Sequence, residues 1–136
     1  MRKALCLALL LAASLPAATA EFVVISNQSL AETEIQAGDL KQIFLGAKTS
    51  IHGRRVEPVV AQSGAAHEKF VSVCLGKTEA GLRNYFRNLV FSGKGSMPRS
   101  FSSAAEMVNY VAKTNGAIGY VGADMKVSGV TILTVK

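Results

Sequence analysis

The segment Gln62-Ser63-Gly64-Ala65 follows an apolar run and precedes a helical pattern, and its residue types could do chemistry. A chain that passes from a strand into a helix exposes several backbone N–H groups, with the positive end of the helix dipole behind them. Ser63 could donate its hydroxyl to a bound oxyanion, or it could cap the helix without any ligand. The pattern is therefore compatible with a small anion site and does not by itself require one.

Two polar loops carry further cationic candidates. Ser92-Gly93-Lys94-Gly95 places a lysine between glycines, which lets the backbone approach a ligand closely. It lacks the strand and the following Ser or Thr of a P-loop. Arg54 and Arg55 could bind an anion in bidentate fashion. A flexible turn at Lys94 and a solvated arginine pair are the alternatives, so the sequence leaves these roles open.

The remaining reactive residue types do not form a catalytic or metal-binding set. His52 and His67 have no metal-ligand spacing with each other or with Cys74. We expect His67 on the polar, solvated side of its helix. Cys74 falls on an apolar stripe, which predicts a buried and unreactive thiol. We therefore expect no enzyme activity, no cofactor and no metal ion.

The strands that must position the candidate residues are indicated by short apolar runs. The run at 22–25 is typical of a buried parallel strand. A second strand is predicted over 56–60, where Pro58 favours an edge or irregular position. Two more are predicted over 117–121 and 130–135, whereas 47–55 has no apolar period and is predicted as an exposed loop.

Four helices are predicted between these strands. They cover 39–46, 65–74 and 79–91, with Thr78 as the cap of the third, and a last helix begins at the capping box Ser103-Ala104-Ala105-Glu106. Ala66, Phe70, Val73 and Cys74 are the predicted buried stripe of the second helix. Strands that alternate with helices predict the α/β class: one compact sheet flanked by helices.

The N-terminus has the pattern of a cleavable secretory signal. Arg2 and Lys3 precede an apolar run that is too short to anchor a protein in a bilayer, and Ala18-Thr19-Ala20 offers small residues for cleavage after Ala20. We therefore expect residues 1–20 to be a signal peptide, residues 21–136 to form one domain, and the product to be periplasmic without membrane insertion. An N-terminal membrane anchor is the alternative.

Composition limits the partners of residues 21–136. They carry 13 basic and nine acidic residues, a net charge of +4 that mildly favours anionic ligands. No basic run is interleaved with aromatic residues, so we expect no nucleic-acid binding. Cys74 is the one cysteine beyond the predicted cleavage point, so an internal disulfide is excluded there.

Several segments together resemble one family. They are Asp39-Leu40-Lys41-Gln42-Ile43-Phe44-Leu45-Gly46, Val56-Glu57-Pro58-Val59, Leu89-Val90-Phe91-Ser92-Gly93-Lys94-Gly95 and Asn115-Gly116-Ala117-Ile118-Gly119-Tyr120-Val121, in that order. The chain from Phe22 to its end resembles the short phosphate ABC-transporter substrate-binding proteins of the periplasmic phosphate-binding-protein-like (type II PBP-like) superfamily. The resemblance implies a single lobe, or a reduced pair of lobes, of a periplasmic binding protein.

The resemblance also implies a ligand and a site. In that superfamily helix N-termini and Ser/Thr hydroxyls hold an anion, and the matching positions here are Ser26, Asn27, Gln62, Ser63, Gly64 and Ala65. Ala65 stands where full-length phosphate binders have a threonine. Those proteins also carry an arginine a few residues earlier, and Val59-Val60-Ala61 offers none here. One hypothesis is a protein that captures phosphate or a similar oxyanion for an ABC importer, with a membrane permease as partner. The other is a non-transport sensory or adaptor module that engages a membrane-protein partner, such as a receptor subunit.

Overall fold

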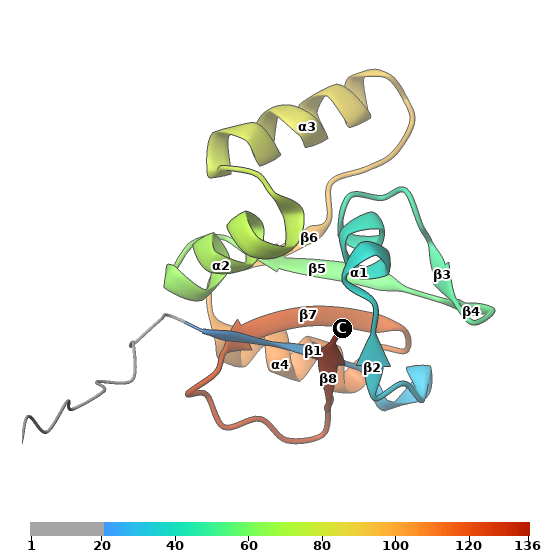
Figure 1. The fold of residues 1–136 in the computed structure, drawn as a ribbon, viewed down its shortest axis with the longest axis vertical. Helices are drawn as coiled ribbons and strands as arrows, with labels where there is room; N and C mark the ends of the chain where they lie inside the picture. The colour runs from blue at the N-terminus through green and yellow to red at the C-terminus, as the bar shows by residue number, and fades with distance from the viewer. Residues whose placement is uncertain (1–20) are drawn as a thin grey trace, which may run out of the picture.

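The computed structural model describes residues 21–136, which form a six-stranded mixed sheet with helices on both faces (Figure 1). The predicted signal peptide, residues 1–20, lies outside the described residues. The strands are β1 (Phe22–Ser26), β2 (Glu34–Ile35), β5 (Glu57–Ala61), β6 (Arg99–Phe101), β7 (Ala117–Gly122) and β8 (Thr131–Val135), and the hairpin strands are β3 (Ser50–Ile51) and β4 (Arg54–Arg55). Their order across the sheet is β2-β8-β1-β7-β5-β6.

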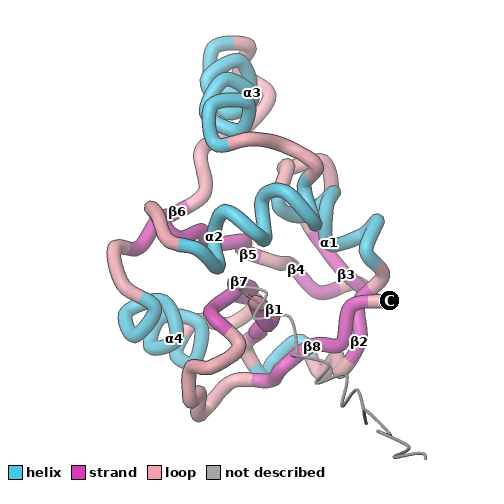
Figure 2. The backbone as a smooth tube through the Cα atoms, turned by 60° about the vertical axis from the view of Figure 1, so that its left-hand side comes forward, coloured by secondary structure: helices cyan, strands magenta, loops and turns pink. Residues whose placement is uncertain are grey.

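Four α-helices surround the sheet: α1 (Ala37–Phe44), α2 (Ala65–Phe70), α3 (Glu79–Phe91) and α4 (Ala104–Lys113). A short 3₁₀ turn (Gln28–Leu30) follows β1, and a π-helical segment (Val71–Leu75) continues α2. Helices α1 and α2 lie on one side of the sheet and α4 on the other, and α3 projects away from the body (Figures 1 and 2). This confirms the predicted α/β class and the layered arrangement.

The sheet is buried on both faces, and β7 shows why. Its side chains alternate between two cores: Ile118 and Tyr120 pack with α1 and α2, whereas Ala117 and Val121 pack with α4. The side chains of β1 also alternate between the two cores, with Val24 in the first and Ile25 in the second. Strand β1 is antiparallel to both of its neighbours, β7 and β8. The predicted parallel direction of β1 is therefore wrong, because a doubly buried strand has the same apolar pattern in either direction.

Strand β5 is an interior strand, whereas Pro58 had favoured an edge or irregular position. It lies between β7 and β6 and is parallel to both. Pro58 is tolerated because it lies near the start of β5, and the pairing with β6 begins one residue later, at Val59. The segment 47–55, predicted as a loop, contains the β3–β4 hairpin, which has too few residues to show a period.

The helix after β5 changes its phase where the π-helical segment begins. The wider turn buries Val71 and Leu75 and leaves Val73 60% exposed, so the predicted stripe fails after Phe70. Cys74 is half-buried, and burial raises the pKa of its thiol, which agrees with an unreactive cysteine.

Helices α3 and α4 agree closely with the sequence patterns. Thr78 accepts a hydrogen bond from the Gly81 N–H at 3.1 Å and caps α3 as predicted. Leu82 and Phe86 form the buried stripe of α3, while Phe91 at its end is 84% exposed. Within residues 21–136, none of the helices combines the length and apolarity that crossing a membrane demands.

Candidate functional site

The starts of α2 and α4 converge at one edge of the sheet. Strands β5 and β6 are parallel neighbours, so their carboxyl ends meet, and the chain enters α2 after one and α4 after the other. A pocket of about 210 Å³ lies between the two helix starts, lined chiefly by Ser63–His67, Ser102–Ala104 and residues 120–122 of β7. The parallel pairing of β5 with β6 therefore creates a site that involves two helix N-termini.

The start of α2 has unsatisfied donors. Gly64 is the N-cap, its φ of 115° is one that side-chain-bearing residues rarely adopt, and no side chain caps the helix. The first intrahelical bond runs from Glu68 N–H to the Gly64 carbonyl at 3.0 Å. The N–H groups of the preceding helical residues therefore have no intrahelical partner. Ser63 is exposed beside them and does not act as the cap.

The start of α4 is only partly capped. Ser103 Oγ accepts the Glu106 N–H at 3.2 Å, as the capping box predicted, while the Glu106 carboxylate bonds the Ser102 hydroxyl at 3.3 Å. The first N–H groups of α4, on Ala104 and Ala105, have no intrahelical acceptor. Of these two residues, Ala104 lines the pocket shared with α2.

A buried polar network forms the base of the pocket. The Tyr120 hydroxyl accepts the Ala61 N–H at 3.0 Å and lies in hydrogen-bond contact with His67 Nδ1. His67 Nε2 contacts Glu79 Oε1 in an ion-pair arrangement, although that oxygen is buried without an aligned hydrogen bond. Tyr120 thus connects the end of β5 to α2, and His67 connects Tyr120 to Glu79.

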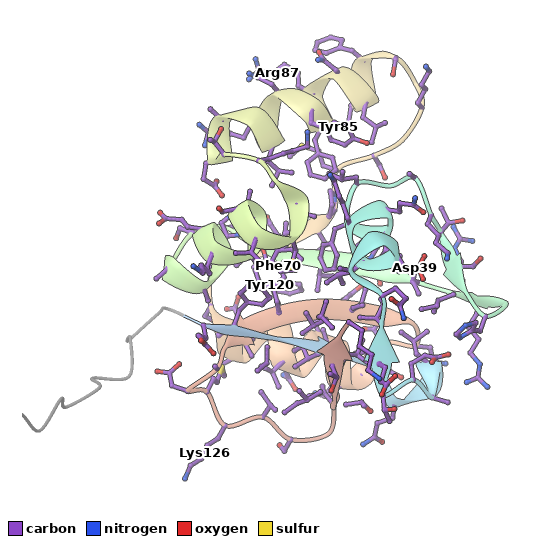
Figure 3. The ribbon with its side chains drawn as sticks, viewed as in Figure 1. Asp39, Phe70, Tyr85, Arg87, Tyr120 and Lys126 are labelled. Carbon is purple, nitrogen blue, oxygen red and sulfur yellow. The ribbon has the colours of Figure 1, made fainter. Side chains whose placement is uncertain are left out.

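His67 is 4% exposed, so the prediction of a solvated histidine is wrong. Phe70 and Val71 lie three and four residues after His67, which puts all three on one helix face. That spacing was the available sequence signal. Ring stacking also holds α2 against β7, since the centroids of the Phe70 and Tyr120 rings lie 3.8 Å apart (Figure 3).

The base of the pocket is uncharged at Tyr120. Burial raises the pKa of this phenol, and the Glu79 charge adds to the rise, while the Ala61 N–H opposes it. Among the residues that the structure describes, no lysine or arginine lines the pocket. An anion here would be held by N–H and O–H dipoles, and the site offers no nucleophile with an adjacent free base.

The structure does not bring all the predicted site residues together. Ser63, Gly64 and Ala65 line the pocket; Gln62 adjoins it, and its N–H bonds the Phe101 carbonyl at 2.9 Å. Ser26 pairs with Ile118 at the start of β7, roughly 13 Å along the strands from Gln62.

Ser26 and Asn27 lie at the opposite end of the sheet from the pocket. Asn27 Nδ2 donates to the Val111 and Ala112 carbonyls at 2.8 and 3.1 Å, and its Oδ1 accepts the Ser29 N–H at 2.8 Å. These bonds join the 3₁₀ turn to the end of α4. Ser26 is fully buried. The start of α4, which sequence reasoning missed, takes their place beside Ser63. Within residues 21–136 there is also no cluster of His, Cys, Asp and Glu that could hold a metal ion.

Solved structures of phosphate-binding proteins share this fold. The chain aligns with an ABC-type phosphate transport receptor from Vibrio cholerae at a TM-score of 0.64 and 16% identity, over 84% of this chain and 45% of that one. It aligns with a putative phosphate ABC transporter substrate-binding protein from Clostridium perfringens, solved with bound phosphate, at 0.65 and 14%, over 84% and 44%. For PstS from Borrelia burgdorferi the values are 0.61 and 16%, over 85% and 47%.

The chain spans less than half the length of these structures, and at such low identity the likeness concerns the fold. No family model and no curated protein matches the chain. Residues 21–136 therefore have the fold of one part of a phosphate-binding protein, as the resemblance implied.

Proposed function

We propose that residues 21–136 bind phosphate or a similar oxyanion between the starts of α2 and α4. The observation that carries this proposal is the convergence of two helix N-termini on one pocket. Both have N–H groups without intrahelical partners, and the exposed Ser63 hydroxyl lies beside them. Helix N-termini with such donors stabilise anions through hydrogen bonds and through the helix dipole.

The described donors include backbone N–H groups and the hydroxyls of Ser63 and Ser103. The absence of lysine and arginine from this lining makes binding depend on directed donors. We therefore expect selection for tetrahedral oxyanions over chloride. Because Ser63, Gly64 and Ala65 are exposed, we expect affinity weaker than that of an enclosed site.

We further propose that the protein is exported and supplies the oxyanion to a membrane permease of an ABC importer. Residues 1–20 would act as the signal peptide, with cleavage after Ala20 and release into the periplasm. The fold shared with substrate-binding proteins of phosphate importers supports this role. On this proposal the protein is a binding protein and not an enzyme.

Calorimetric titration of residues 21–136 with phosphate, sulfate and molybdate tests the proposal. We expect saturable heat with at least one of these anions, and a Ser63→Ala variant should weaken binding about tenfold, the effect of one lost charge-assisted hydrogen bond. Ser128→Ala removes an exposed serine outside the pocket and is the matched control, which should bind as the wild type does. The proposal fails if no anion gives saturable heat or if both variants bind equally well.

A further inference from the structure

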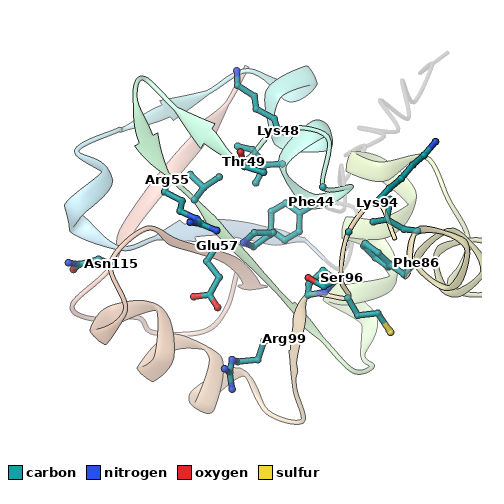
Figure 4. Close-up of a pocket in the computed structure, with 18 residues that line it drawn as sticks. Phe44, Lys48, Thr49, Arg55, Glu57, Phe86, Lys94, Ser96, Arg99 and Asn115 are labelled. Atoms are coloured by element: carbon teal, nitrogen blue, oxygen red, sulfur yellow. The ribbon is translucent and has the colours of Figure 1, made fainter. Parts of the chain in front are cut away.

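A larger cavity lies at the opposite ends of β5 and β6. Its volume is about 530 Å³, and it opens between α1, the start of β5 and the loop that follows α3 (Figure 4). Glu57 and Pro58 at the start of β5 line it, as does Arg99 at the start of β6. The candidate oxyanion site is lined by Ala61 and Phe101, the last residues of the same strands. The two sites are therefore separate.

The lining of this cavity is strongly cationic. Arg55, Lys94 and Arg99 have no acidic partner within ion-pair distance anywhere in the described chain, whereas Lys48 pairs with Asp39 at 3.0 Å. The Arg99 guanidinium lies over the Tyr110 ring at 5.1 Å. In Figure 4 the Arg55 side chain points across the opening, while the amino groups of Lys48 and Lys94 point away.

The net charge of residues 21–136 comes from the segment that forms one wall of this cavity, and two of its basic residues, Lys94 and Arg99, line the cavity. The segment 77–99, which contains α3 and the following loop, carries five basic residues and one acidic residue. The remaining residues from 21 to 136 carry eight of each sign. The net charge of +4 thus belongs to the part of the chain that forms one wall of the cavity. Such a field attracts anions to the opening.

One carboxylate faces the same space. Among the described residues, Glu57 is the only acidic one in the lining. Both its oxygens lie 2.8 Å from the Tyr110 hydroxyl, which donates to them. The contact holds the carboxylate beside Tyr110, whose ring also contacts the Arg99 guanidinium. Glu57 therefore opposes an incoming anion while Arg55 and Arg99 attract it.

The floor of the cavity is apolar. Phe44, Val56 and Phe86 are buried in the main core and form part of the lining, and Leu89 and Met97 add apolar surface near the opening. An inorganic oxyanion would leave most of this surface and volume unused. The dimensions and the mixture of apolar and charged groups suit a small organic ligand.

We propose that this cavity binds a small organic anion whose carboxylate or similar group lies near Arg55 and Arg99 and whose apolar body packs on Leu89 and Met97. This inference does not rest on the oxyanion site. It places a second ligand of a different chemical class at the other end of β5 and β6.

Titration of residues 21–136 with 1-naphthoate tests the proposal, because this probe joins a carboxylate to an apolar body. Backbone amide NMR shifts report where it binds. We expect saturable shifts in residues 44–58 and 86–99, and little change at 63–66. The neutral probe 1-naphthalenemethanol should bind at least about tenfold more weakly, because it lacks the charge-assisted bonds.

Matched variants measure the effect of each charged side chain on naphthoate binding. Arg55→Gln should weaken naphthoate binding about tenfold, whereas Arg54→Gln, on the same hairpin but bonded to the Ser29 carbonyl, should change it less than about twofold. Glu57→Gln removes the opposing charge and should strengthen binding. Circular dichroism should show all three variants folded.

Several results would overturn this proposal. One is the lack of saturable shifts at millimolar naphthoate. Others are equal affinity of wild type and Arg55→Gln, equal affinity for the neutral probe, or shifts confined to residues 63–66. Loss of inorganic phosphate binding at the α2 and α4 starts would leave these expectations unchanged.

Discussion

At the scale of single residues, the Tyr120 hydroxyl supports the candidate oxyanion site from below. It accepts the Ala61 N–H at the end of β5 and bonds His67 in the first turn of α2. One phenol thus joins the last residue of the strand to the helix whose start forms the site. Its ring packs against Phe70 in the core.

The Tyr120→Phe substitution should destabilise the fold by about 1–3 kcal/mol, because the Ala61 N–H and His67 Nδ1 lose their partner. Urea unfolding measures the change. Tyr85→Phe is the control: its hydroxyl makes one described bond, to the Leu45 carbonyl at 2.6 Å, and we expect a loss of only about 1 kcal/mol. Equal losses in the two variants would contradict the proposed network.

The same phenol predicts a response to alkaline pH. Burial raises the pKa of Tyr120 above its ordinary value of 10.0, so the unfolded chain loses this proton at lower pH than the native protein. The stability contributed by the neutral phenol is complete below pH 10 and is lost as pH rises from there through the native pKa.

Urea unfolding of wild type and Tyr120→Phe between pH 8 and pH 11 tests this response. The wild type should lose free energy of unfolding more steeply above about pH 10, and the stability difference between the two proteins should shrink. A difference that stays constant across this range would show that Tyr120 titrates alike in both states.

At the scale of elements, the turn from α4 into β7 depends on Gly116. Its φ is 77°, and an added Cβ would lie 2.3 Å from the Arg55 carbonyl oxygen. The neighbouring bond from Glu57 N–H to the Gly116 carbonyl, at 2.8 Å, fixes this approach. The close contact joins the β3–β4 hairpin to the sheet.

Gly116→Ala should therefore destabilise the protein by more than about 2 kcal/mol, since it adds a backbone clash to the cost of a positive φ. Gly53→Ala is the matched control, with a φ of 78° and nothing within 4 Å of the added Cβ. It should cost only about 1 kcal/mol. Thermal unfolding compares them, and similar losses would argue against the close approach.

The projecting helix α3 predicts local opening. Thr78→Ala removes its N-cap, worth about 1 kcal/mol, from an element that few described contacts hold to the body. Amide hydrogen exchange should accelerate in residues 79–91. In Ser103→Ala, the comparable cap of α4, it should accelerate in residues 104–113. Unchanged exchange in α3 would contradict this account.

Local patterns were sufficient to predict most elements. The caps at Thr78 and Ser103 and the apolar runs of β5, β7 and β8 act over a few residues. The direction of β1, the short strands β2 and β6 and the π-helical turn depend on partners distant in sequence. A single sequence does not show those partners.

The residues of the candidate site also fall into a group that local sequence predicts and a group that it does not. Ser63, Gly64 and Ala65 could be predicted because a strand-to-helix turn is a local feature. The contribution of α4 could not, because it depends on β6 pairing with β5. Ser26 and Asn27 follow the first strand, and they fall at the far end of the sheet because β1 runs opposite to β5 and β7.

At the scale of the whole molecule, two candidate ligand sites occupy opposite ends of the parallel pair β5 and β6. The pocket at the carboxyl ends presents dipoles and no described cationic side chain, and the lining of the cavity at the other end includes Arg55 and Arg99 together with Glu57. The charged end therefore attracts anions in general, and the dipolar end is suited to select among small ones. Binding at one end should leave the other accessible.

Amide NMR during phosphate titration of residues 21–136 tests the central claim most directly. We predict saturable shifts at Ser63–Ala66 and Ser103–Ala105 together, reduced in both segments by Ser63→Ala. Shifts only around Arg55 and Arg99, or shifts at neither helix start, would contradict an oxyanion site formed by α2 and α4.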